Sequence, residues 1–192
     1  NLKSRGMNAP ALAIGDGAMG FWAALDEVYP TTRQQRCWQH KTMNVLNCLP
    51  KLSQPKAKAA IHNIWQAETK ADAEKVFDLF LKTYEPKYPK ATLCLQKDRE
   101  ELMAFFDFPA KHRQSIRTSN PIESAFATIR HQTKRSKGCL SRDGMLHMIF
   151  KLGQCAEQNW RKLRGFDTLA KVITGVKFKD GIEATKPSQI AA

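Results

Sequence analysis

The chain has 192 residues, 42% hydrophobic and 26% charged, so it can bury a core as one ordinary domain or one with a modest insertion. No apolar run approaches the roughly 18 residues of a membrane-spanning helix, and we therefore expect no membrane partner. The formal charge of +13 is uneven, because residues 111–165 hold twelve Lys and Arg against three acidic residues. This concentration favours a polyanion such as nucleic acid as partner, although a basic surface that serves only solubility is the alternative.

The cysteines do not form a disulfide framework, because there are five of them at irregular spacing. An odd number in a chain of globular composition favours a reducing compartment. We therefore expect a cytoplasmic protein, associated with the nucleoid if the polyanion is DNA. The chain starts at Asn1 without a secretory signal, and we expect an N-terminal truncation.

A strand, a helix and a second strand are predicted in the first 40 residues. The apolar run 11–14 predicts a buried strand, and Gly15, Asp16 and Gly17 predict a turn after it. Residues 18–28 predict a helix, and residues 33–38 predict a weakly patterned second strand. The strands of such a βαβ unit are normally parallel.

A block of helices follows, of mixed charge and punctuated by prolines. We interpret this block as an all-helical insertion. The expected helices are 40–49, 54–67, 70–85 and 89–106.

The chain is organised around residues 117–123 and the helix that follows them to Lys137. Asn120 predicts a helix N-cap, Pro121 suits the first helical position, and Glu123 falls where a capping box places its acid. One interpretation of this segment is structural: a capped helix whose polar face is solvated. The alternative is functional: Glu123 binds a metal beside a helix that binds phosphate. A long amphipathic helix is expected at about 142–164, before a weakly patterned tail.

Two carboxylates are candidates for a metal site. Asp16 follows a predicted parallel strand, at the end of the sheet where ligands bind in open α/β folds. Brought together with Glu123, it could bind Mg²⁺, which prefers oxygen ligands. A turn residue or helix cap is the alternative for Asp16.

Cys37 and His40 form a Cys-x-x-His element. Structural zinc needs four ligands, and Cys48, Cys94 and His62 supply no obvious second pair. We therefore favour a packing Cys with a His near a phosphate groove over a zinc site.

These parts occur in an order that resembles the mutator-type insertion-sequence transposases of bacteria. The matching stretches within residues 10–165 are LAIGDGAMGFW, RCWQHK, a helical insertion, and RTSNPIES with Arg130 seven residues beyond its Glu. The resemblance implies that Asp16 is the second catalytic Asp and Glu123 the catalytic Glu of an Asp-Asp-Glu core. It also implies that Cys37 and His40 are the family's Cys-x-x-His pair.

The implied fold class is α/β: a partial ribonuclease-H-like fold, with the βαβ unit and C-terminal helices interrupted by the helical insertion. We expect residues 1–40 to hold the C-terminal strands of that core and 41–110 the insertion. Residues 111–165 would hold the catalytic-Glu helix and the basic C-terminal helices, and 166–192 the tail.

The implied function is a transposase that cuts and joins double-stranded DNA at insertion-sequence ends, as a homodimer or higher oligomer. The complete protein would use two Mg²⁺ or Mn²⁺ ions, with Asp16 and Glu123 among their ligands. From charge and position, we expect DNA contacts from Arg117, Arg130, Lys134, Arg135 and Lys137.

The chain departs from the family pattern at its start. The family's first catalytic Asp lies upstream of where this chain begins, and residues 1–15 contain no Asp or Glu. We therefore expect a C-terminal fragment that is inactive alone. The alternatives are a non-catalytic basic DNA-binding protein and a ribonuclease-H-like nuclease outside transposition.

Overall fold

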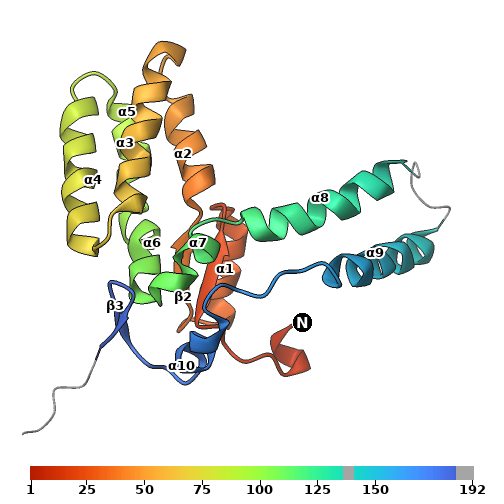
Figure 1. The fold of residues 1–192 in the computed structure, drawn as a ribbon. Coiled ribbons are helices and arrows are strands. Elements are labelled where there is room, and N and C mark those ends of the chain that lie inside the picture. Colours follow the sequence, from red (N-terminus) through yellow and green to blue (C-terminus); the bar gives the residue numbers. More distant parts are fainter. Residues whose placement is uncertain (136–140, 185–192) are drawn as a thin grey trace, which may run out of the picture. The chain divides into compact units, whose positions relative to one another are not determined.

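The computed structural model describes residues 1–135 and 141–184, apart from the side chain of Thr128. The chain divides into two compact units. Residues 1–118 with the segment from Arg164 onward form what we call the core unit. Residues 119–163 form the helix-pair unit. Most of the described chain is helical (Figure 1).

The core unit begins with the expected βαβ element. Strand β1 (Leu12–Gly15) and strand β2 (Arg33–Arg36) are parallel, with Leu12 opposite Arg33 and Gly15 opposite Arg36. Helix α1 (Met19–Val28) connects them. This confirms the α-β pattern predicted for the first 40 residues, although β2 stops two residues early. Just after β2, the Cys37 N–H donates to the Gly15 carbonyl at 2.8 Å. Helix α2 then starts at Trp38, two residues before the predicted start at His40.

The expected helical block is present, with one break. Four helices lie side by side in Figure 1: α2 (Trp38–Asn47), α3 (Gln54–Gln66), α4 (Lys70–Tyr84) and α5 (Pro89–Gln96). The prediction of a single helix over residues 89–106 is wrong. It divides into α5, α6 (Arg99–Met103) and the 3₁₀ turn η3 (Ala104–Asp107). Asp98 stands at the N-cap position of α6 with a non-helical backbone, and its side chain makes no capping hydrogen bond.

The core is built from the apolar faces of these helices. Aromatic rings dominate its centre: Phe105 and Phe106 are fully buried and lie 4.2 Å apart between ring centroids. Phe77, Phe80 and Trp38 are buried around them. Complete burial of such side chains stabilises the folded state by about 1.5–3 kcal/mol each.

The segment after the helix-pair unit returns to the core unit and is more ordered than its weak pattern predicted. It contains the 3₁₀ turn η5 (Phe166–Thr168), helix α10 (Leu169–Ile173) and a hairpin of strands β3 (Phe178–Lys179) and β4 (Ile182–Glu183). At the hairpin turn, the Asp180 carboxylate accepts the Lys70 N–H at the start of α4. Elements this short leave little periodicity for sequence reasoning to find. The remaining short elements are η1 (Lys3–Arg5), η2 (Lys51–Ser53), η4 (Ala110–His112) and α7 (Arg113–Ile116).

The helix-pair unit consists of α8 (Asn120–Arg135) and α9 (Arg142–Glu157), which contact each other. Asn120, expected as the N-cap of α8, is the first residue of the helix. The Ser119 hydroxyl donates to the Glu123 carboxylate. Helix α9 is capped by Ser141 and ends before the expected Arg164. None of the described side chains of this unit is buried.

Within the described part of the chain, no helix is long and apolar enough to cross a membrane.

Candidate functional site

Asp16 lies at the carboxyl end of β1, as the sequence predicts, and its side chain is exposed. Its Oδ1 accepts the Ala18 N–H at 3.0 Å, which closes a turn between the strand and α1. This hydrogen bond uses one carboxylate oxygen and leaves Oδ2 to bind a cation. The Asp16 carboxylate therefore fits the oxygen-ligand chemistry of Mg²⁺.

Both neighbours of Asp16 are glycines that lie close to side chains of other elements. A Cβ on Gly15 would lie 2.7 Å from Cζ2 of Trp22, on α1. Gly17 has a φ of +92°, which side-chain-bearing residues rarely adopt, and a Cβ there would overlap the Arg36 guanidinium. The turn that presents Asp16 is therefore packed from α1 on one side and from β2 on the other.

Arg36 belongs to a buried charge cluster that also contains Lys41 and Asp98. Arg36 donates Nε to Asp98 Oδ2 at 2.9 Å, and the fully buried Lys41 forms an ion pair with the same oxygen. Lys41 also donates to the Cys94 carbonyl at 2.7 Å. Burial opposes ionisation of Asp98, but the two cations outweigh it and lower the pKa of this carboxyl below its ordinary value.

Sequence reasoning missed this cluster, although one signal was present. In α2, Trp38, Lys41, Thr42 and Val45 are all buried, at the spacing of an apolar stripe. A lysine on such a stripe must find a partner, because an unpaired buried charge is costly. The sequence contains no local sign that this partner is Asp98, 57 residues farther along the chain.

Cys37 and His40 lie within one turn of each other at the start of α2. The Cys37 sulfur is 3.3 Å from Nδ1 of His40, and Cys37 is fully buried. Among the residues that the structure describes, no group of three or more His, Cys, Asp or Glu side chains could hold a metal ion. The structure brings Cys37 and His40 together, and the packing role expected for them stays a prediction.

Arg117, expected to contact DNA, is held within the core unit. Its guanidinium lies 4.4 Å from the Trp65 ring centroid, and Nη1 donates to the Trp65 carbonyl at 2.9 Å. Burial, and then the nearby charge of Arg113, lower the pKa of Arg117. Arg113 stacks on Phe106 at 4.6 Å. Arg117 therefore has a packing role besides the predicted DNA contact, which stays a prediction.

The remaining predicted site residues lie on α8 in the helix-pair unit. Glu123 is exposed in its first turn, and Arg130, Lys134 and Arg135 are exposed farther along. Lys137 lies outside the described residues. Since Asp16 belongs to the core unit and Glu123 to the helix-pair unit, the shared cation site stays a prediction.

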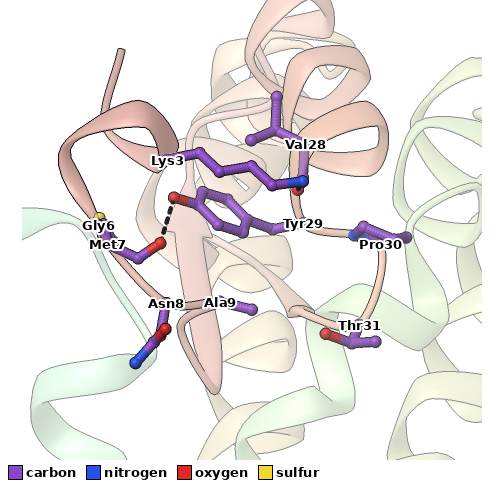
Figure 2. A pocket seen from close by; sticks show the side chains of 9 residues that line it. All are labelled: Lys3, Gly6, Met7, Asn8, Ala9, Val28, Tyr29, Pro30 and Thr31. Atoms are coloured by element: carbon purple, nitrogen blue, oxygen red, sulfur yellow. Dashed lines mark hydrogen bonds between the residues drawn. The ribbon is translucent and has the colours of Figure 1, made fainter.

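A pocket of about 400 Å³ lies elsewhere in the core unit (Figure 2). It is lined by residues before β1, such as Met7 and Asn8, and by Tyr29, Pro30 and Thr31 before β2. The Tyr29 hydroxyl donates to the Met7 carbonyl at 2.9 Å. This pocket is therefore at the amino ends of the strands, opposite to Asp16. Ligands of open α/β sheets bind at the carboxyl ends, so we do not assign the candidate site to it.

Comparisons with known proteins identify the family of the chain. Residues 1–162 match the model of a family described as "Transposase, Mutator family". The chain is 56% identical over 185 residues to the transposase for insertion sequence element IST2 of Acidithiobacillus ferrooxidans, covering 96% of this chain and 62% of the relative. It is 45% identical over 190 residues to the transposase for IS6120 of Mycolicibacterium smegmatis, covering 99% of this chain and 59% of the relative. The chain thus spans about 60% of the length of these relatives.

Proposed function

Because the chain belongs to the Mutator family of transposases, we propose that it forms part of an enzyme that cuts and joins DNA at insertion-sequence ends. The observation that carries this proposal is Asp16. Its exposed carboxylate is held by a hydrogen bond at the carboxyl end of a parallel strand, between two closely packed glycines. A carboxylate presented in this way suits metal-assisted phosphoryl transfer.

Asp16 and Glu123 would hold divalent cations, Mg²⁺ or Mn²⁺, together with an upstream Asp. When bound, two such ions activate an attacking hydroxyl and stabilise the leaving oxygen at phosphorus. Asp16 would contribute from a rigid turn and Glu123 from the first turn of α8, where the Ser119 hydroxyl orients its carboxylate. The βαβ element, extended by upstream strands, would then form a ribonuclease-H-like core.

The basic side chains of α8 would bind the DNA backbone. Arg130 and Lys134 are four residues apart and so lie on the same side of the helix. Phosphate contacts of this kind position a duplex without reading its sequence. Binding both transposon ends and target DNA would bring two or more copies together on DNA, in the bacterial nucleoid.

The proposal is tested by cleavage of DNA that carries the element's ends, using a protein extended upstream to include the first Asp. Asp16→Asn and Glu123→Gln should each abolish Mg²⁺-dependent cleavage and leave DNA affinity unchanged. Glu157→Gln is the matched control, because Glu157 is an exposed acid of the same helix pair. Cleavage that survives both substitutions would contradict the assignment.

The 192-residue chain alone should not cleave DNA in Mg²⁺ or Mn²⁺. Two cations about 4 Å apart need more anionic oxygens than Asp16 and Glu123 supply. Cleavage by the purified chain that disappears in Glu123→Ala would contradict this account. Salt-dependent DNA binding without cleavage, even by the extended protein, would favour the non-catalytic binding protein.

A further inference from the structure

The turn that presents Asp16 rests on a side chain that the helical insertion holds. Gly17 lies directly against the guanidinium of Arg36, which is only 7% exposed. The Arg36 Nη1 atom is buried and has no hydrogen-bond partner among the described residues. An arginine with an unsatisfied buried nitrogen needs a strong interaction elsewhere to stay in place.

That interaction comes from Asp98, between α5 and α6. Its Oδ2 accepts from Arg36 Nε at 2.9 Å and also pairs with Lys41, whose side chain is completely buried. Lys41 is fixed in turn by the Cys94 carbonyl near the end of α5. Asp98 is thereby held by two cations, and only 21% of its side chain is exposed.

We propose that Asp98 and Arg36 are positioning residues for the Asp16 carboxylate, so that the helical insertion sets the geometry of the candidate metal ligand. The order of contacts is Asp98 to Arg36, Arg36 to Gly17, and Gly17 to its neighbour Asp16. The metal-ligand role of Asp16 in this inference rests on the proposed function, whereas the positioning of the turn does not.

The inference gives the helical insertion a role besides forming the core. If the Asp98 carboxylate is removed, the buried Arg36 and Lys41 lose the acid that neutralises them. The Arg36 guanidinium is then no longer held against Gly17. The turn then gains conformational freedom, and the hydrogen bond from Ala18 to Asp16 weakens. Groups that orient a metal ligand in this way typically change metal affinity by about 10- to 100-fold when they are mutated.

The first test measures the order of the turn in the full 192-residue chain by ¹⁵N relaxation. In the unmodified chain, the Gly17 and Ala18 amides should have order parameters near 0.85, and in Asp98→Asn these should fall below about 0.6. Asp107→Asn is the matched control, because Asp107 also pairs with a β2 arginine, Arg33, but on the surface at 3.5 Å. Unchanged order parameters in Asp98→Asn would overturn the inference.

A second variant covers the case in which Asp98→Asn fails to fold. Arg36→Lys keeps a cation near Asp98 but removes the guanidinium plane under Gly17. It should loosen Gly17 and Ala18 in the same way while the α3 and α4 amides keep their order. A turn as rigid as in the unmodified chain would again overturn the inference.

A third measurement separates positioning from a general structural role. Mn²⁺ should broaden the Gly17 and Ala18 amide signals of the unmodified chain, and Arg36→Lys should require about tenfold more Mn²⁺ for the same broadening. An equal Mn²⁺ requirement would overturn the positioning role. Asp16→Asn tests the proposed function separately: broadening that persists in this variant would remove Asp16 as a ligand, whatever the order parameters show.

Discussion

The two carboxylates of the candidate site lie in units of very different construction. Asp16 belongs to the core unit, where Phe77, Phe105 and Phe106 are fully buried. Glu123 belongs to the helix-pair unit, where none of the described side chains is buried and Phe126 is 52% exposed. The Asp16 carboxylate, a proposed ligand, is therefore held by packing within its own unit. The position of Glu123, the other proposed ligand, depends on what the helix pair packs against.

From this difference we infer different roles for the two units. We expect the Asp16 turn, which packs against the buried Arg36, to keep its geometry without DNA. A pair of amphipathic helices without a core of its own gains most of its stability from packing against other surfaces. Assembly on DNA would then complete the site by bringing the second ligand to the first.

The largest expected effect is the removal of a core ring. Phe105→Ala should lower the free energy of unfolding by about 3–5 kcal/mol, because it removes a fully buried ring and leaves a cavity. Phe126→Ala in the helix pair should cost only about 0.5 kcal/mol. Chemical denaturation of both variants compares the units directly. A Phe126→Ala cost as large as that of Phe105→Ala would show that the helix pair is covered in the isolated chain.

The next effect concerns the buried charge cluster. Asp98→Asn should cost about 2–4 kcal/mol of stability, somewhat less than for a fully buried pair because its side chain is 21% exposed. The reason is that Arg36 and Lys41 keep their charges while their shared acid is gone. Denaturant titration measures this, and Asp107→Asn on the surface serves as the small-effect control.

The same carboxylate should make stability depend on pH. The pKa of Asp98 in the folded state lies below its ordinary value of 3.8, so its contribution is complete above about pH 5 and disappears as the pH falls through the folded-state pKa. The unmodified chain should therefore lose stability on acidification below pH 4 more steeply than Asp98→Asn. Equal slopes in this window would contradict the ion pairing.

A smaller effect is expected at the turn itself. Gly17→Ala should cost about 1–3 kcal/mol, because it strains a backbone at φ +92° and pushes against the Arg36 guanidinium. Gly20→Ala is the matched control, since a Cβ at Gly20 meets nothing within 4 Å. Thermal unfolding compares each variant with the unmodified chain, and a Gly17→Ala midpoint equal to that of the unmodified chain would mean that the turn is not tightly packed.

Substitutions on the basic surface of α8 should have the smallest effect on stability. Their effect is measured as DNA affinity instead. Replacing Arg130 and Lys134 with Ala should flatten the salt dependence of binding by about one unit of slope for each phosphate that the variant no longer binds. Lys56 and Lys58, exposed on α3 of the core unit, form a matched control pair. An unchanged slope in the α8 variant would remove these residues from the interface.

The local elements could be predicted from the sequence, and the links between distant residues could not. The apolar run before Gly15 and the turn residues after it located β1 and Asp16, because both signals are local. The break at Asp98 escaped prediction, since the Arg36 and Lys41 partners that hold it lie about 60 residues away. Arg117 was assigned to DNA from its charge and position alone, and its packing on Trp65 depends on tertiary structure.

The central claim is that Asp16 and Glu123 share a cation. The most direct measurement is a structure of the upstream-extended protein bound to its DNA ends in Ca²⁺ or Mn²⁺. The account predicts that both carboxylates bind the same metal centre, with ligand oxygens at about 2.1 Å for an ion of the size of Mg²⁺ and slightly farther for Ca²⁺. A well-ordered, metal-bound complex in which the two carboxyl groups lie more than about 10 Å apart would contradict it.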